Sequence, residues 1–281
     1  MTLQNLHDFH RDPHWCCAIV AHRGVWRDSS ENSVASVEAA IASDLQFVEI
    51  DVRRSRDGKL ICFHDETLDR MTAMTGPVDL HDWRTLSSTA LKYADGGPAA
   101  ELSPHTIPAL EHILEAARER IYIDLDIKHE YLLDDTVAAI QALDMGRQII
   151  LKIEIHRSED FDRCERMARD TGFIFKPVVM VTAGNLDWML SELERRAFPV
   201  VEALFETWEQ IEAVVPRMRK HGTDVFLNSL DGIAGDVLKD RDAMMDPQKV
   251  WRRAIELGVR LIQTDRPRTL YASLQNNWRR D

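Results

Sequence analysis

The chain has 281 residues, of which 44% are hydrophobic, and a formal net charge of −12. This length and apolar content suit one large α/β barrel or two ordinary domains. The negative charge argues against a nucleic acid as the main partner, because phosphate backbones bind basic surfaces. A small anionic substrate is still compatible with a locally positive site.

The start of the chain and the cysteines indicate a protein of a reducing compartment. Residues 1–15 lack the basic flank and apolar core of a signal peptide, and we expect no transmembrane segment because no run of about 18 apolar residues occurs. The four cysteines show no zinc-ligand spacing, so we interpret them as reduced thiols of a cytoplasmic protein, with Cys62 buried in a strand. The spacing of His7, His10 and His14 is compatible with metal ligation, but we favour a solvated N-terminal turn.

Short apolar strands alternate with amphipathic helices along most of the chain, a pattern typical of a parallel sheet made of β-α-β units. It predicts a TIM (β/α)8 barrel, although nine strands are expected where the barrel has eight. The turn Arg56-Asp57-Gly58 is too short for a crossover helix and Asp-Gly is typical of a hairpin, so one of the strands beside it should depart from parallel geometry. The expected strands are 17–22, 47–53, 60–64, 121–127, 149–155, 177–182, 200–206, 225–229 and 259–264, and the expected helices are about 31–41, 109–119, 133–143, 159–170, 185–196, 208–220 and 247–257.

Residues 66–108 interrupt this alternation. They contain Gly76-Pro77 and Gly96-Gly97-Pro98, with one short helical pattern near 79–87. About forty residues hold little core alone, so we expect an insertion on the barrel rim within a single domain, 1–281. The insertion follows a strand end, which is where active-site loops lie in TIM barrels.

Glu49 and Asp51 carry the first indication of chemistry. Side chains alternate along a strand, so both point to one face while their apolar neighbours point to the other. Two carboxylates about 7 Å apart on one strand face suit a divalent cation, which prefers oxygen ligands. The alternative is a buried ion pair with Arg23 or Arg53.

A later strand repeats this arrangement with Asp124, Asp126 and Lys128 on one face. Because the apolar face is expected to pack against helices, the charged face should point inward near the mouth of the barrel. The alternative is a solvent-exposed edge position for Asp124 and Asp126.

His22 ends the first strand and is followed by Arg23 and Gly24. A glycine at this point allows close approach of the backbone to a ligand, and arginine binds phosphate in a bidentate fashion. A helix start follows at Ser29–Asn32, whose free backbone amides suit an anion.

In this order the residues resemble the glycerophosphodiester phosphodiesterase family, which is related in fold to the phosphoinositide-specific phospholipases C. The likeness spans about residues 18–270. The matching segments are His22-Arg23-Gly24, Glu31-Asn32-Ser33, Glu49-Ile50-Asp51, Arg56-Asp57-Gly58, His64-Asp65, Asp126-Ile127-Lys128 and Thr264-Asp265-Arg266-Pro267.

The resemblance implies a metal-dependent hydrolase of lipid metabolism that cleaves glycerophosphodiesters to glycerol 3-phosphate and an alcohol. It implies one divalent cation, Mg²⁺ or Ca²⁺, and a small-molecule phosphodiester as the partner. The roles carried over by position are metal ligation for Glu49, Asp51 and Asp126, acid–base catalysis for His22 and His64, and phosphate binding for Arg23 and Lys128. Asp124, on the same strand face, is the alternative to Asp126 as the third ligand, and Glu31 is a further group beside the site.

Two departures from the family pattern stand out, the first at the metal site and the second at the substrate. Asp126 stands where the family has Glu, which is longer by one methylene. Lys152, Glu154 and His156 replace a Ser-Phe strand end, and we expect them to contact the leaving group unless they form a local ion pair. The same chemistry on a lysophospholipid or an opine-type sugar phosphodiester is therefore an alternative, and a barrel that binds a phosphorylated ligand without turnover is a more distant one. The sequence leaves a homo-oligomer open.

Overall fold

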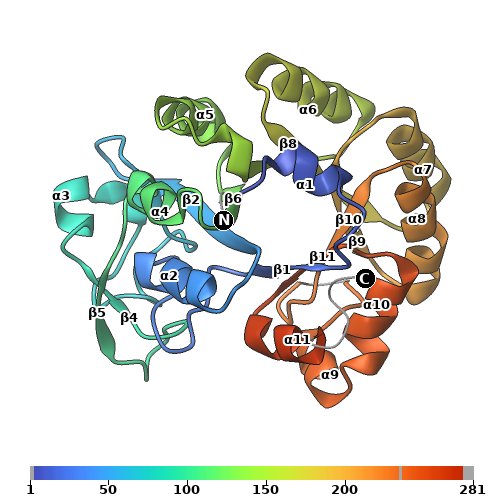
Figure 1. Cartoon of the computed structure of the whole chain (residues 1–281). Coiled ribbons are helices and arrows are strands. Elements are labelled where there is room, and N and C mark those ends of the chain that lie inside the picture. The colour runs from blue at the N-terminus through green and yellow to red at the C-terminus, as the bar shows by residue number, and fades with distance from the viewer. Residues whose placement is uncertain (1–2, 234–235, 275–281) are drawn as a thin grey trace. The chain divides into compact units, whose positions relative to one another are not determined.

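A computed structural model of the chain describes residues 3–233 and 236–274 (Figure 1). Its main sheet has the strand order β1-β11-β10-β9-β8-β7-β6-β2-β3, and β1 also pairs with β2. Eight strands thus close on themselves, and helices lie between them along the chain. The predicted TIM barrel is confirmed. Among the described residues, no helix combines the length and the hydropathy that a membrane span needs.

The ninth expected strand is the second arm of a hairpin. β3 pairs antiparallel with β2, with Val52 opposite Cys62, and Gly58 occupies the left-handed region at φ +89° in the turn between them. The prediction that a strand beside this turn departs from parallel geometry is confirmed, and Cys62 is fully buried as expected.

The chain divides into two compact units, which we describe separately. The first is Ala21–Ile149 with Leu3, and the second is Gln4–Val20 with the described residues from Ile150 onward. The elements of the first unit are α2 (Val34–Ala42), β2 (Phe47–Arg54), β3 (Leu60–Cys62), η1 (Val78–Leu80), α3 (Trp83–Leu86), β4 (Ala90–Lys92), β5 (Leu102–Thr106), α4 (Leu110–Ala117), β6 (Tyr122–Ile127), η2 (Glu130–Leu132), α5 (Leu133–Ala142) and η3 (Gly146–Gln148).

In the first unit, β2 and β6 run parallel and in register, with Glu49 opposite Asp124 and Asp51 opposite Asp126. The apolar residues between them, such as Val48 and Ile50, have no exposed surface. Burial of these alternating apolar side chains fixes the register of the two strands. A slip of one residue would turn the carboxylates to the opposite face of the sheet.

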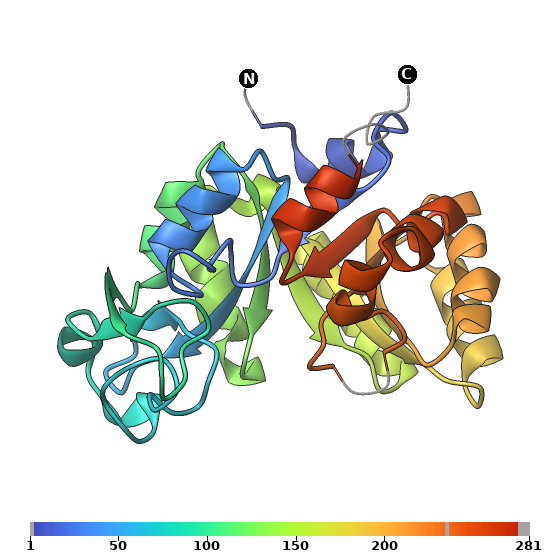
Figure 2. The same ribbon diagram turned by 90° about the horizontal axis from the view of Figure 1, so that it is seen from below.

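Segment 66–108 contains η1, α3 and the antiparallel pair β4–β5. It lies at the carboxyl ends of β2 and β6, in the blue-green part of the ribbon (Figure 2). Its apolar residues, among them Leu68, Met71 and Leu91, form one cluster with Ile61 and Phe63 from outside the segment. Because the cluster is shared, the segment packs onto the β2–β3 hairpin.

The second unit holds the remaining strands and helices, apart from one end residue each of β1 and β7. Its strands from β7 to β11 are parallel where their registers are defined. The elements are α1 (Leu6–Arg11), β1 (Ala18–Ala21), β7 (Ile149–Glu154), α6 (Ser158–Thr171), β8 (Ile174–Val181), α7 (Leu186–Arg195), β9 (Val200–Phe205), α8 (Trp208–Lys220), β10 (Asp224–Asn228), α9 (Asp240–Met245), the π-helical turn η4 (Gln248–Arg252), α10 (Arg253–Leu257), β11 (Leu261–Thr264) and α11 (Pro267–Leu274).

The expected strand at 177–182 begins three residues earlier, at Ile174. Lys176, in the added part of the strand, is fully buried beside Glu202. A tertiary ion pair therefore extends the strand.

The prediction of a solvated N-terminal turn is wrong for His10. Residues 6–11 form the helix α1, and its Leu6 is buried together with His10. The His10 Nδ1 atom lies 2.7 Å from Asp224 Oδ2, and Arg219 donates to the other oxygen of Asp224. Burial, partly offset by Asp224, lowers the pKa of His10, so this ring is a neutral core group.

His10 should make stability depend on pH. The unfolded chain takes up a proton near pH 6.5, whereas the folded chain keeps the ring neutral, so the free energy of unfolding should fall as the pH drops below that value, by at most about 1.4 kcal/mol per pH unit. In urea denaturation between pH 7.5 and 5.5, His10→Phe should lose this slope. The exposed His14, changed to Phe, is the control and should keep it. An unchanged slope in His10→Phe would contradict the assignment.

Candidate active site

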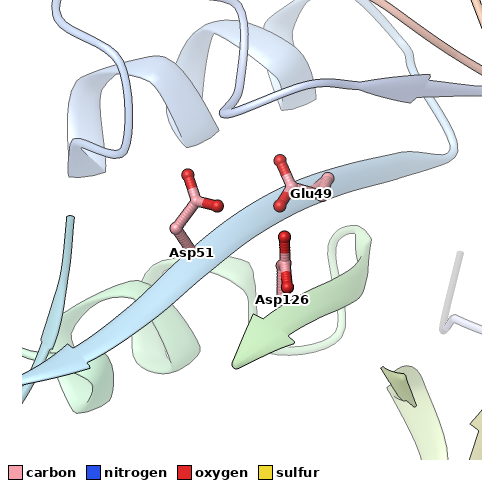
Figure 3. Close-up of side chains that lie close together, drawn as sticks. All are labelled: Glu49, Asp51 and Asp126. Carbon is pink, nitrogen blue, oxygen red and sulfur yellow. The ribbon is translucent and has the colours of Figure 1, made fainter. Parts of the chain in front are cut away.

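Three carboxylates from two strands form the centre of the site. Ligand oxygens of Glu49, Asp51 and Asp126 all lie within 4.8 Å of one another, and Figure 3 shows the three side chains converging from β2 and β6. Glu49 and Asp51 are 1% exposed, while Asp126 is partly exposed. An all-oxygen, largely buried cluster of three negative charges fits a divalent cation.

Two cationic side chains lie against this cluster. The Lys128 Nζ atom is 2.6 Å from Asp51 Oδ1 and 2.7 Å from Asp126 Oδ2, and the Arg23 Nε atom is 3.4 Å from Asp51 Oδ2. The Arg23 backbone amide also donates to Glu49. Three carboxylates and two cations leave a negative charge that a bound cation would neutralise.

These contacts set the protonation states. Burial raises the pKa of Asp51, but Lys128 and Arg23, and then His64 and His22, hold it well below its usual value. Burial lowers the pKa of Lys128, but Asp51 and Asp126 reverse the effect and raise it. Asp51 is thus ionised and Lys128 is charged.

The buried ion pair that was the alternative for Asp51 exists in the structure, with Arg23 as the partner. Arg53 points elsewhere, because its Nε atom donates to the His64 carbonyl at 2.7 Å. Asp51 can therefore pair with Arg23 and also lie close to the carboxylates of Glu49 and Asp126 in the same site. Asp124 is fully buried, so the exposed-edge alternative is wrong for that residue.

Asn32 orients Asp51 through two hydrogen bonds. Its Nδ2 atom donates to Asp51 Oδ2 at 2.6 Å, and its Oδ1 atom accepts from the Asp51 amide at 3.0 Å. The sequence predicted no role for the Asn32 side chain. Its backbone is left-handed at φ +53°, a conformation in which asparagine is enriched, and an Asn just before a helix start was the signal available.

The turn after His22 is tightly fixed. Arg23 and Gly24 have φ values of +57° and +86°, and the Arg23 carbonyl accepts from the Asn32 amide and the Ser36 hydroxyl. Ser36 also forms a capping box with Ser33, so α2 begins at Val34, three residues after the expected start. The helix cap and the Arg23 backbone thus hold each other in place.

The remaining predicted groups of the first unit surround this centre. His22 and His64 are both partly exposed. The His64 Nδ1 atom lies 2.7 Å from Asp65 Oδ1, and the Arg23 Nη1 atom donates to both oxygens of Glu31 at 3.1 and 3.2 Å.

Arg70, for which the sequence predicted no role, contacts both acids of these pairs, Asp65 and Glu31. It lies in segment 66–108, where no strand or helix pattern marked it.

The three polar residues at 152–156 belong to the second unit. Glu154 and His156 form an exposed pair with an Nε2–Oε2 distance of 3.4 Å, which includes two of the three residues of the local ion pair that was the alternative. Lys152 lies 3.8 Å from Glu202, whose second lysine partner is the buried Lys176. A role for Lys152 in the choice of alcohol stays a prediction.

The fold and the site together define a TIM-barrel protein with a candidate divalent-cation centre at its strand ends. The family model described as "Glycerophosphoryl diester phosphodiesterase family" matches residues 22–269. The chain therefore belongs to this family, as its motifs suggested.

Individual proteins agree with this assignment. A glycerophosphodiester phosphodiesterase of Bacillus altitudinis is 34% identical over 115 residues, which are 40% of this chain and 45% of the relative. The chain spans about half the length of the curated relatives it matches.

Among solved structures, a glycerophosphoryl diester phosphodiesterase of Parabacteroides distasonis has a TM-score of 0.79 at 21% identity, covering 98% of this chain and 94% of that one. An Oleispira antarctica phosphodiesterase in complex with the product sn-glycerol-3-phosphate has a TM-score of 0.65 at 19% identity, covering 97% and 100%. At these identities the likeness shows the fold.

The tight turn at Gly24 gives a test of the site's rigidity. A Cβ atom there would lie 2.8 Å from the Ser36 backbone carbon, whereas one at Gly58 would meet nothing within 4 Å, and both glycines have similar positive φ. Gly24→Ala should therefore lower the free energy of unfolding by about 1–3 kcal/mol more than Gly58→Ala. Urea denaturation measures both, and equal losses would show that the packing around Gly24 is loose.

Proposed function

We propose that this protein is a metal-dependent phosphodiesterase that cleaves glycerophosphodiesters to glycerol 3-phosphate and an alcohol. The observation that carries the proposal is the convergence of Glu49, Asp51 and Asp126 with Lys128 and Arg23 beside them. Membership of the family and the product named for the Oleispira antarctica neighbour support the choice of substrate.

Each side chain has a role that follows from its chemistry. Glu49, Asp51 and Asp126 would hold the cation, which when bound supplies positive charge to a phosphate oxygen. Arg23 and Lys128 would bind the phosphate and stabilise the charge that builds up on it during the reaction.

The two histidines would transfer the protons. A carboxylate accepts, so His64 Nδ1 carries its proton toward Asp65, which leaves Nε2 for exchange with the substrate. One imidazole would accept a proton from the attacking hydroxyl and the other would donate one to the leaving alkoxide. Attack by the hydroxyl next to the phosphate on the glycerol would benefit from its proximity.

Mg²⁺ and Ca²⁺ are both included in this proposal, since an all-carboxylate set suits either ion. A cytoplasmic location is also part of it, motivated by four cysteines that are free thiols in the structure.

Removal of the metal tests the centre. Treatment with EDTA should lower the release of choline from glycerophosphocholine by at least about 100-fold, and added Mg²⁺ or Ca²⁺ should restore it. Asp51→Asn should reduce turnover by a similar factor with either ion. Asp82→Asn is the control, because Asp82 is a partly exposed carboxylate paired with Arg56, and it should retain activity. Full activity after chelation would exclude the metal from the reaction.

The histidines give a second test. His22→Ala and His64→Ala should each lower kcat by about 10²–10⁴-fold, the usual contribution of a positioned acid or base. The exposed His112 serves as the control and should tolerate alanine. If either active-site variant keeps wild-type kcat, that histidine does not transfer a proton in the limiting step.

A substrate panel decides between the proposed activity and its alternatives. Glycerophosphocholine, lysophosphatidylcholine and a sugar phosphodiester should be compared with wild type and Lys152→Ala, and we expect the glycerophosphodiester to be cleaved fastest. No alcohol release from any of them, with either metal, would refute the proposed enzyme. If Lys152→Ala leaves the ranking unchanged, Lys152 does not select the alcohol.

A further inference from the structure

Arg70 joins two pairs of residues in the candidate active site. Its Nε and Nη2 atoms donate to the two oxygens of Asp65 at 2.7 and 2.8 Å. Its Nη1 and Nη2 atoms donate to the two oxygens of Glu31 at 3.0 and 2.6 Å. One planar guanidinium therefore binds both carboxylates in a bidentate fashion, a geometry that lysine cannot reproduce.

Each of these carboxylates has its other partner among the groups proposed to act on the substrate. Asp65 accepts from His64 Nδ1 at 2.7 Å, and Glu31 accepts from the Arg23 guanidinium at 3.1–3.2 Å. The contacts run without a break from His64 through Asp65, Arg70 and Glu31 to Arg23. The proton-transfer group and the phosphate-binding group are thus parts of one network.

Burial distinguishes this network from an ordinary surface ion pair. Glu31 is 3% exposed and the Arg70 side chain is 30% exposed. Surface pairs contribute little, but removal of one partner of a buried pair leaves the other without compensation. Burial raises the pKa of Asp65, but hydrogen bonds from His64 and Arg70 reverse the effect and keep the carboxylate ionised.

Segment 66–108 holds Arg70 in place. The Arg70 guanidinium donates to the Asp95 carbonyl at 2.5 Å, and the Arg70 carbonyl accepts from the Gly97 amide at 2.8 Å. A Cβ atom at Gly96 would come within 3.1 Å of the Arg70 carbonyl carbon, and the neighbouring Met71 is buried in the segment's apolar cluster. The backbone and the side chain of Arg70 are both fixed by residues more than twenty positions away.

We propose that Arg70 is a positioning residue of the active site, which orients the His64 ring through Asp65 and the Arg23 guanidinium through Glu31. The segment 66–108 then sets the geometry of proton transfer, in addition to covering the strand ends. This inference rests on the proposed function, because it assigns His64 and Arg23 their roles in that reaction.

The experiment compares Arg70→Met, Arg70→Lys, Asp65→Asn and the double variant Asp65→Asn/Arg70→Met in hydrolysis of glycerophosphocholine. Arg70→Met should lower kcat by about 10–100-fold with a smaller change in KM, since Arg70 orients groups and does not bind substrate. Arg70→Lys should recover little, because the two-sided fork is lost. In the Asp65→Asn background, Arg70→Met should cost less than in the wild-type background, because the route to His64 is already removed and only the route through Glu31 to Arg23 remains.

A second readout does not depend on activity. Long-range ¹H–¹⁵N spectra of the histidine rings, with His64 assigned through His64→Ala, should show the Nδ1-protonated tautomer in the wild type and a mixture in Arg70→Met. Arg56→Met is the matched control. Arg56 binds Asp82 in a bidentate fashion at an exposed position, and its loss should change neither kcat nor the spectrum.

The outcomes separate this inference from the proposed function. If the wild type does not cleave the substrate, the proposed function fails, and the tautomer of His64 alone decides on the positioning role. If the wild type is active and Arg70→Met keeps kcat within threefold and the same tautomer, Arg70 is not a positioning residue. If the fold-loss in kcat of the double variant equals the product of the losses in the two single variants, Arg70 does not act through Asp65. Should Arg70→Met fail to fold, Arg70→Lys decides by the same criteria.

Discussion

The in-register pairing of β2 with β6 is the constraint on which the site depends. It places Glu49 opposite Asp124 and Asp51 opposite Asp126, so that four acidic side chains come from two adjacent strands in a largely buried position. Such a concentration of carboxylates is costly unless cations compensate it. The neighbouring structure supplies that compensation, with Lys128 between Asp51 and Asp126 and Arg23 against Asp51 and Glu49. The charge that remains explains why a divalent cation suits the centre.

Rigidity around this centre comes from backbone contacts that reach it from elsewhere in the first unit. The left-handed residues Arg23 and Asn32 are held by hydrogen bonds to each other and, in the case of Asn32, to Asp51. Strained backbone of this kind persists where the surroundings over-determine it, and here the cap of α2 does so through Ser36. Through Glu31, Arg70 brings segment 66–108 into the same network. A segment that looks like an insertion in the chain is therefore connected to the groups that would act on the phosphate.

The second unit has its own buried charges, which belong to a different arrangement. Lys176 has no exposed surface, lies 2.7 Å from Glu202 and sits 3.3 Å from the centroid of the Phe226 ring. Asn228 donates to the other oxygen of Glu202, and burial of this glutamate is outweighed by its lysine neighbours, which lower its pKa to about 2. A buried lysine with a full set of partners is thus accommodated within β8, which begins at Ile174.

The sequence by itself determined the family, the barrel, the hairpin at Gly58 and the identity of the charged face, because alternation and turn chemistry are local properties of the chain. Glu49, Asp51 and Asp126 were predictable as a group, since two strands with carboxylates at alternate positions meet at one edge of a parallel sheet. Only the tertiary structure decided which residues pair. Asp51 pairs with Arg23 and not with Arg53, and Asn32 orients Asp51 through hydrogen bonds. Arg70 links Asp65 with Glu31, and Asp224 is the partner of His10. These contacts join residues that are up to 214 positions apart. The local periodicity of a sequence does not indicate which side chains pair over such a separation. The sequence shows which residues carry charge, whereas the tertiary structure determines which of these charged side chains are in contact.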